Sequence, residues 1–266
     1  MSHTPALLGR DPAFMRRFLQ LLDPVVTRWH RSEVRGLEHV PDGPSLLVGN
    51  HSGGFFTMDF PVLASAWAQR FGLGRPLYLL AHSVIFVGRA GDLLRRMGLV
   101  PASTANALEV LRAGAPLLVF PGGDHDAGRP TSARNVVDFD GRTGYVQTAL
   151  DAGVPIVPVV SIGGHENQLY LARGRRLAEY TGLRALARVS VLPITVGLPW
   201  GPALGLIAPL NIPLPTKIVT RVLPPVNIAA EFGPDPDRRA VDQHIRKLMQ
   251  AELDELAKRR RFPVIG

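Results

Sequence analysis

The chain has 266 residues, 46% of them hydrophobic, and a formal net charge of +8 at pH 7. This length suits one large α/β domain, and the apolar content excludes a disordered chain. The absence of cysteine excludes disulfides, cysteine-ligated metals and a thiol nucleophile. The positive charge predicts an anionic partner, such as a membrane surface or a phosphorylated substrate. No nucleic-acid partner is expected, because no nucleic-acid-binding motif is present.

The N-terminal residues 1–33 place Phe14, Phe18, Leu21 and Leu22 at helical spacing among several arginines. This pattern predicts an amphipathic helical extension ahead of a single domain formed by residues 34–266. Such a helix is typical of a membrane interface, and a helix packed against its own domain fits the pattern equally well.

Beyond residue 34, short apolar segments alternate with segments of helical periodicity. Strands are predicted at 46–48, 77–80, 99–100, 116–120, 156–162 and 217–223, and helices at 60–71, 84–97, 105–113, 144–152, 168–187 and 237–261. Residues 124–140 are predicted to form a polar loop. The alternation predicts an α/β fold, a single domain with a largely parallel central sheet flanked by helices.

The longest uncharged stretch covers residues 189–216. It is long enough to cross a bilayer, but its prolines argue against a continuous helix. We expect a partly buried membrane contact, the wall of an apolar tunnel, or an ordinary core segment with loops.

The main chemical signal lies between Ser45 and Asp59. An apolar strand ends at Gly49 and delivers His51 into a glycine-rich bend, with Asp59 further along the chain. An imidazole that a carboxylate holds in one tautomer is a general base for a hydroxyl group. His51 and Asp59 are therefore the predicted catalytic pair, although a histidine at a strand end is also a common structural hydrogen-bonding group.

Other polar residues suggest weaker alternatives. Ser52 beside His51 suggests a serine hydrolase, but the chain contains no G-x-S-x-G turn. The run from Asp124 to Asp126 looks like a metal cluster, but neighbouring ligands without spaced partners favour a solvated loop, and no metal is expected. His165 and Glu166, after a predicted strand, either line a pocket or cap the strand.

Four blocks in the chain occur in a distinctive order. Residues 50–54 (N-H-S-G-G), followed by Asp59, resemble the first motif of the glycerolipid acyltransferases, the family of lysophosphatidate acyltransferase. Residues 120–123 (F-P-G-G) resemble the F-P-E-G block of that family, in the P-G-G form of its diacylglycerol acyltransferase-like relatives. Residues 98–103 lie where the second motif is expected, and residues 154–159 resemble the final V-P-I-V-P-V strand.

The chain also departs from the family pattern. The spacing between His51 and Asp59 is H-x7-D instead of H-x4-D, so we expect the segment to loop before its helix begins and let the carboxylate reach back. Gly122 replaces the glutamate of F-P-E-G, and Asp124 or Glu166 is expected to substitute for it in part. The second motif lacks its usual phosphate-binding arginine, which leaves as candidates Arg89, Arg95, Arg96, Arg129, Arg134 and Arg142.

The resemblance implies a membrane-peripheral O-acyltransferase on the cytoplasmic face of the cell membrane. His51 would take the proton of an acceptor hydroxyl, which attacks the thioester of an acyl-CoA or acyl carrier protein, while Asp59 orients the imidazole. The implied acceptor is lysophosphatidate, another lysophospholipid or a neutral glyceride. Acyl-CoA is a co-substrate, and no cofactor is expected. The alternatives are a non-catalytic lipid-binding or carrier protein of the same fold and a lipid esterase.

The same resemblance implies a set of substrate-binding residues, some of which offer backbone N–H groups to a tetrahedral oxyanion. The predicted set is Asn50, Ser52, Gly53, Gly54, Pro121, Gly122, Gly123, Asp124, Arg129, Arg142, His165 and Glu166.

Overall fold

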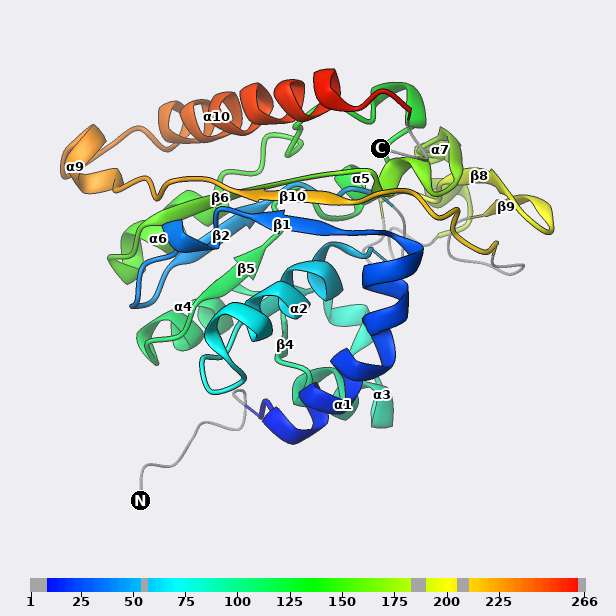
Figure 1. Ribbon diagram of the computed structural model, residues 1–266. Coiled ribbons are helices and arrows are strands. Elements are labelled where there is room, and N and C mark those ends of the chain that lie inside the picture. The colour runs from blue at the N-terminus through cyan, green and yellow to red at the C-terminus, as the bar shows by residue number, and fades with distance from the viewer. Residues whose placement is uncertain (1–8, 54–56, 183–189, 205–210, 263–266) are drawn as a thin grey trace.

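The computed structural model describes residues 9–53, 57–182, 190–204 and 211–262. A seven-stranded sheet with the order β1-β10-β6-β2-β5-β3-β4 runs through its centre (Figure 1). All neighbouring strands are parallel except β10 and β6. The strands are β1 (Glu33–Arg35), β2 (Leu46–Gly49), β3 (Tyr78–Ala81), β4 (Leu99–Pro101), β5 (Leu117–Val119), β6 (Ile156–Ile162) and β10 (Val219–Val222). The predicted largely parallel sheet is confirmed.

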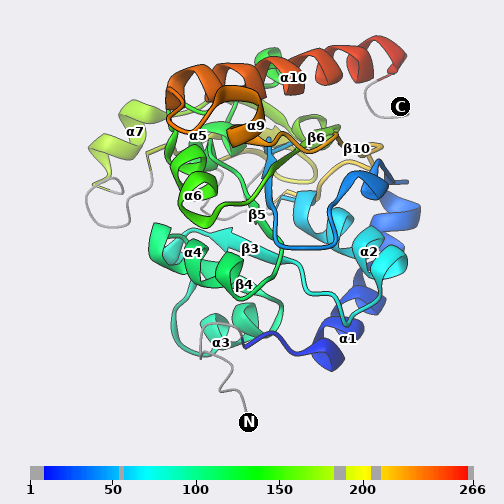
Figure 2. The same cartoon turned by 90° about the vertical axis from the view of Figure 1, so that its left-hand side faces the viewer.

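Helices cover both faces of this sheet, which explains why its strands read as continuous apolar runs. In β2, Leu46 and Val48 face one core and Leu47 faces the other, and all three are buried. Figure 2 shows α4, α6 and α10 on one side of the sheet and α1 and α2 on the other. These helices are α1 (Pro12–Asp23), α2 (Asp59–Phe71), α4 (Thr104–Arg112), α6 (Gly144–Ala152) and α10 (Arg238–Arg259).

The N-terminal helix packs on the domain that follows it. Asp11 caps α1 by accepting the N–H groups of Ala13 and Phe14, and Met15 is buried in the same core as Trp67 of α2. The chain then continues as a π-helix, η2 (Pro24–Trp29), into the first strand. Of the two alternatives for this helix, the structure shows packing against its own domain.

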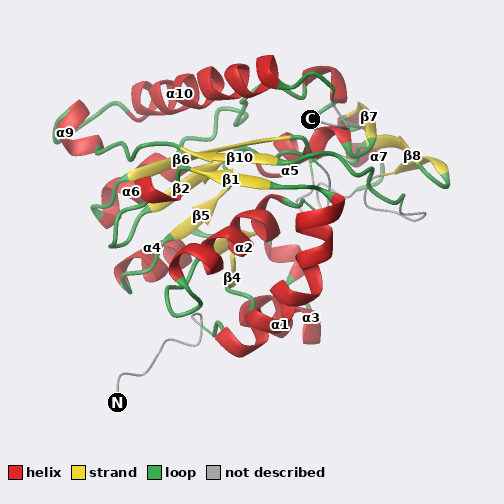
Figure 3. Ribbon diagram, in the orientation of Figure 1, coloured by secondary structure: helices red, strands yellow, loops and turns green. Residues whose placement is uncertain are grey.

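A second sheet lies at one end of the molecule (Figure 3). Its strands β7 (Leu169–Ala172), β8 (Ile194–Gly197) and β9 (Gly201–Leu204) pair antiparallel in that order. The predicted helix at 168–187 is therefore wrong over its first part, and α7 covers only Arg175–Tyr180. The physical reason is a period of two: Leu169 and Leu171 are exposed while Tyr170 between them is buried. Residues 183–189 lie outside the described part.

Two further predictions need adjustment. The helix expected at 84–97 is a 3₁₀ turn, η4 (Ser83–Ile85), followed by α3 (Gly88–Arg96). The segment expected as a polar loop at 124–140 begins with the short helix α5 (Gly123–Ala127). A last short helix, α9 (Ile228–Phe232), precedes α10. Among the described residues, no helix is both long enough and apolar enough to cross a bilayer.

Candidate active site

The predicted site residues lie on loops that follow three neighbouring strands. His51 follows β2, the segment from Phe120 to Gly122 follows β5, and His165 follows β6. Because β2 pairs in parallel with both β5 and β6, the three loops leave the sheet at the same edge. Open α/β sheets bind their ligands at this edge, beyond the carboxyl ends of the strands.

His51 and Asp59 are in direct contact. The Nδ1 atom of His51 lies 3.1 Å from Oδ2 of Asp59, and the Asp59 side chain is buried. The backbone N–H of Ser52 donates to the same oxygen at 3.0 Å, and the Ser52 hydroxyl donates to the other carboxylate oxygen. Asp59 is the first residue of α2, where the helix dipole favours a negative charge. The helix begins only at Asp59, as expected, and the H-x7-D spacing is compatible with the contact.

The ring of His51 is held in place from a second direction. The phenyl ring of Phe120 stacks on it, with ring centroids 4.1 Å apart and an interplanar angle of 16°. Gly49 makes room for this ring, because a Cβ atom there would lie 2.6 Å from Cε1 of Phe120. With Nδ1 engaged by Asp59, Nε2 is the ring nitrogen of His51 available to a substrate.

His51 lines a cavity of about 860 Å³. This volume falls within the range of roughly 300–1,000 Å³ typical of small-molecule sites. The wall is mainly apolar, and Val84 and Leu93 are also exposed, so the cavity reaches the surface beside η4 and α3. Apolar side chains of the wall include Phe60, Leu79, Leu80, Ile85, Leu94, Met97, Val119, Phe120, Val191 and Leu204.

The small sheet forms one wall of this cavity. Thr195 of β8 and Ala203 of β9 line it, together with Val191, Pro193 and Leu204 from the uncharged stretch at 189–216. Part of this stretch therefore forms a wall of the cavity, in line with the expectation of an apolar wall. A membrane contact of the same stretch stays a prediction.

A buried carboxylate that the sequence analysis assigned to a solvated loop supports the backbone of His51. The N–H of His51 donates to Oδ2 of Asp126 at 2.7 Å, and the other oxygen of Asp126 pairs with Arg129. Both side chains are fully buried. A Cβ on Gly122 would lie 2.4 Å from Cβ of Asp126, so the Asp126 side chain occupies the space beside the glycine that replaces the family's glutamate.

Neither predicted substitute for that glutamate contacts His51. Asp124 lies 3.1 Å from Arg142, and Glu166 pairs with Arg134 and Arg260. Burial alone would raise the pKa of Asp124, but the N–H of Ser190 and the Arg142 guanidinium more than offset this and lower it. That Asp124 or Glu166 substitutes in part for the glutamate stays a prediction, and the carboxylate that accepts the backbone N–H of His51 is Asp126.

The other substrate-binding predictions divide into two groups. Pro121, Gly123, Asp124 and Arg142 line the cavity. The N–H of Gly123 donates to the Phe120 carbonyl at 3.0 Å, so this group is engaged within the turn and is not held ready for an oxyanion. Arg142 donates to the carbonyls of Pro121 and Gly122 as well as to Asp124.

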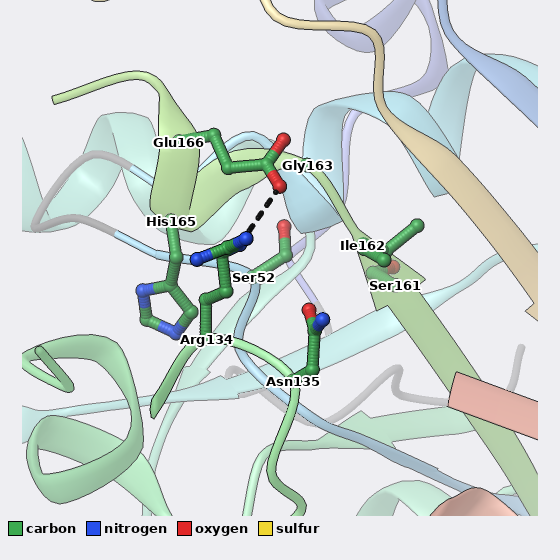
Figure 4. Close-up of a pocket in the computed structure, with 8 residues that line it drawn as sticks. All are labelled: Ser52, Arg134, Asn135, Ser161, Ile162, Gly163, His165 and Glu166. Carbon is green, nitrogen blue, oxygen red and sulfur yellow. Dashed lines mark ion pairs between the residues drawn. The ribbon is translucent and has the colours of Figure 1, made fainter. Parts of the chain in front are cut away.

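The second group does not line the cavity; it consists of Asn50, Ser52, Arg129, His165 and Glu166. The Asn50 side chain exchanges two hydrogen bonds of 2.9 Å with the backbone of Ser161 in β6. Figure 4 shows a small crevice where Ser52 and His165 lie near Glu166, which is turned toward Arg134. Arg129 is buried against Asp126, and Gly54 lies outside the described residues.

The glycines of two of these loops permit close backbone contact. A Cβ atom on Gly164 would lie 1.9 Å from the Ser52 carbonyl oxygen, and one on Gly53 would lie 2.5 Å from the N atom of His165. The loops after β2 and β6 therefore cross with their backbones touching. The glycine-rich bend serves this crossing.

Two of the arginines proposed in place of the missing motif arginine, Arg95 and Arg96, lie on the surface. Arg95 pairs with Asp92 and Arg96 with Asp11, and neither arginine lines the cavity. Within the described ranges, no three His, Asp or Glu side chains gather as a metal site would require. Within the Asp124–Asp126 run, Nε2 of His125 is hydrogen-bonded to Oδ2 of Asp138 at 2.8 Å.

Fold and site together define an α/β protein with a His–carboxylate pair at the edge of an apolar cavity. A family model described as Acyltransferase matches residues 31–162. An uncharacterized protein of Mycobacterium tuberculosis is 32% identical over 265 residues, which cover 97% of this chain and 71% of that protein. The chain belongs to the glycerolipid acyltransferase family, and it is an acyltransferase.

Two other relatives carry functional names. The human "DGAT1/2-independent enzyme synthesizing storage lipids" is 33% identical over 134 residues, which cover 49% of this chain and 40% of that protein. The crystal structure of the 1-acyl-sn-glycerophosphate acyltransferase PlsC from Thermotoga maritima has a TM-score of 0.54 at 17% identity, covering 91% of this chain and 79% of that one. The structural likeness confirms the fold class.

Arg129→Met tests the support beneath His51. The substitution leaves the buried Asp126 charge unpaired, so we expect a loss of about 3–5 kcal/mol in the free energy of unfolding, measured by urea denaturation. Adding Asp126→Asn should restore part of the loss, because the uncompensated charge is removed. Arg112→Met, at an exposed position of α4, is the control and should change stability by less than about 0.5 kcal/mol. An equally small effect of Arg129→Met would contradict the assignment.

The pH dependence of stability tests the environment of His165. Burial, and then the charge of Arg129, lower the pKa of His165 well below its ordinary value. Below about pH 6.5 the His165 imidazole binds a proton in the unfolded chain but stays neutral in the folded chain. The free energy of unfolding therefore falls by up to about 1.4 kcal/mol for each pH unit of acidification. His165→Phe should therefore reduce the drop in Tm between about pH 7 and pH 5. An unchanged drop would show that His165 is protonated in the fold.

Proposed function

We propose that this protein is a membrane-peripheral O-acyltransferase that moves a fatty acyl group from acyl-CoA or acyl carrier protein to a glycerolipid hydroxyl. The observation that carries the proposal is His51, which lines the apolar cavity while Asp59 engages its Nδ1 atom. A thioester and a lipid hydroxyl both fit such a cavity. The absence of cysteine fits a reducing compartment, in line with the cytoplasmic face of the cell membrane.

In the proposed reaction, Nε2 of His51 accepts the proton of the acceptor hydroxyl as the oxygen attacks the thioester carbonyl. The tetrahedral intermediate then expels the thiolate, which takes the same proton from the imidazolium. The products are an ester and a free thiol. Asp59 keeps the proton on Nδ1 and stabilises the imidazolium, the role of the carboxylate in a catalytic triad. This chemistry needs no cofactor.

The charge of the cavity bears on the acceptor. Of the cavity-lining residues that the structure describes, Arg142 is the sole lysine or arginine, and it is paired with Asp124. This neutral wall favours a glyceride without a phosphate as a second candidate acceptor, beside lysophosphatidate and other lysophospholipids. The name of the human relative, which refers to storage lipids, points the same way. If a phosphate-bearing acceptor binds, Arg142 is the residue that would hold it.

Release of free CoA from a long-chain acyl-CoA tests the proposal. Because the chain contains no cysteine, a thiol reagent reports only the released CoA. We expect release to require one member of a panel of lysophospholipids, monoacylglycerols and diacylglycerols, and His51→Ala to reduce it by roughly 10²–10⁴-fold. His244→Gln, at a partly buried position of α10 outside the cavity, is the control and should leave the rate unchanged.

The other outcomes are equally informative. Acceptor-independent release would indicate a thioesterase, and no release with any acceptor from a protein that still binds lipid would favour the carrier alternative. If Arg142→Gln raises KM for lysophosphatidate alone and not for a monoacylglycerol, then Arg142 binds the phosphate.

A further inference from the structure

The turn between β8 and β9, together with Ile212 beside it, exposes large apolar side chains. Leu198, Trp200 and Ile212 are 65%, 62% and 59% exposed. Leu198 and Ile212 form an antiparallel bridge, with the N–H of Ile212 donating to the Leu198 carbonyl at 2.7 Å, so their side chains are neighbours. The Asn211 side chain accepts the N–H of Trp200 at 3.0 Å and donates to the Gly201 carbonyl at 2.9 Å. The turn is therefore held in one shape with its apolar side chains outward.

A second tryptophan adjoins this turn. The indole N–H of Trp29 donates to the Pro213 carbonyl at 3.0 Å, next to Ile212, and the ring is 42% exposed. The exposed Arg28 and Arg31 flank Trp29 in the sequence. In Figure 1, η2 and the segment that leads into β10 lie beside each other at this end of the molecule. Leu198, Trp200, Ile212 and Trp29 form one surface, here called the tryptophan patch.

The tryptophan patch borders the cavity. Asn211 and Pro213, on either side of Ile212, line the cavity, as do Thr195 of β8 and Ala203 of β9. The segments that expose the patch to solvent thus also form the wall of the apolar interior.

We propose that the tryptophan patch docks onto a lipid bilayer with anionic headgroups and so presents the cavity to membrane-borne substrate. This inference rests on the proposed function. Leucine and isoleucine enter the apolar part of a bilayer, tryptophan favours the interface, and flanking arginines attract anionic headgroups. A contiguous exposed apolar patch marks an interaction surface, and the net charge of +8 complements an anionic one.

Flotation with vesicles of phosphatidylcholine and phosphatidylglycerol tests the docking. The double substitution Leu198→Asn with Trp200→Gln should lower the vesicle partition coefficient about tenfold or more, which corresponds to about 1.4 kcal/mol. Leu248→Gln is the matched control, since it removes an apolar side chain that is 36% exposed on α10. This control should bind as the unmodified protein does. Equal binding by the double variant and the unmodified protein would overturn the proposal.

Fluorescence adds a readout that does not depend on folding of the double variant. The chain has three tryptophans, and Trp67 is buried in the core. In a Trp29→Phe variant, Trp200 is therefore the remaining exposed indole. Vesicles that contain brominated lipids should quench it and shift its emission to the blue. An unquenched Trp200 in a vesicle-bound protein would show that another surface docks.

Two comparisons separate this proposal from the proposed function. The His51→Ala variant should bind vesicles normally while losing acyl transfer. If the unmodified protein binds vesicles but transfers no acyl group, the result would contradict the proposed function and leave the docking proposal intact. If the unmodified protein dimerises with increasing concentration in the absence of vesicles, and the double variant does not, the patch binds a second copy of the chain. This result would overturn the docking proposal.

Discussion

The active-site loops depend on one buried carboxylate. Asp59 accepts hydrogen bonds from the His51 ring, from the Ser52 backbone and from the Ser52 hydroxyl. A buried carboxylate is costly unless donors and dipoles compensate for its lost hydration, and here the start of α2 adds to these three donors. In the proposed mechanism, the same charge also determines which nitrogen of His51 carries the proton.

The residues that hold the backbone of His51 are not those that line the cavity. The parallel strands β2, β5 and β6 bring their loops together. The loops that contain Gly53 and Gly164 cross in close contact, and the buried Asp126–Arg129 pair holds the backbone of His51. The apolar wall comes from the central strands β3, β4 and β5, from α2, η4 and α3, and from the small sheet. In the proposed reaction, this support of His51 would let acyl transfer keep its geometry while the cavity takes a long acyl chain.

Most of the central sheet could be predicted from the sequence, because the periodicity of β2, β6 and α2 is local. The His51–Asp59 contact was predictable despite its unusual spacing, since glycines made a loop before α2 the natural interpretation. The role of Asp126 was not predictable from the sequence. Asp126 lies 75 residues after His51, and the two meet only because β5 pairs with β2. The strand at Leu169–Ala172 was missed for a similar reason, since its partner β8 lies beyond α7 and the undescribed residues 183–189.

In the proposed mechanism, Asp59 keeps the proton of neutral His51 on Nδ1 and leaves Nε2 free as the base. Nitrogen-15 NMR of histidine-labelled protein measures this directly, with the His51 signals assigned by comparison with His51→Gln. We expect a protonated Nδ1 and an unprotonated Nε2 at neutral pH, with the balance between the two tautomers shifting in Asp59→Asn. A proton on Nε2 of the neutral ring in the unmodified protein would contradict this mechanism.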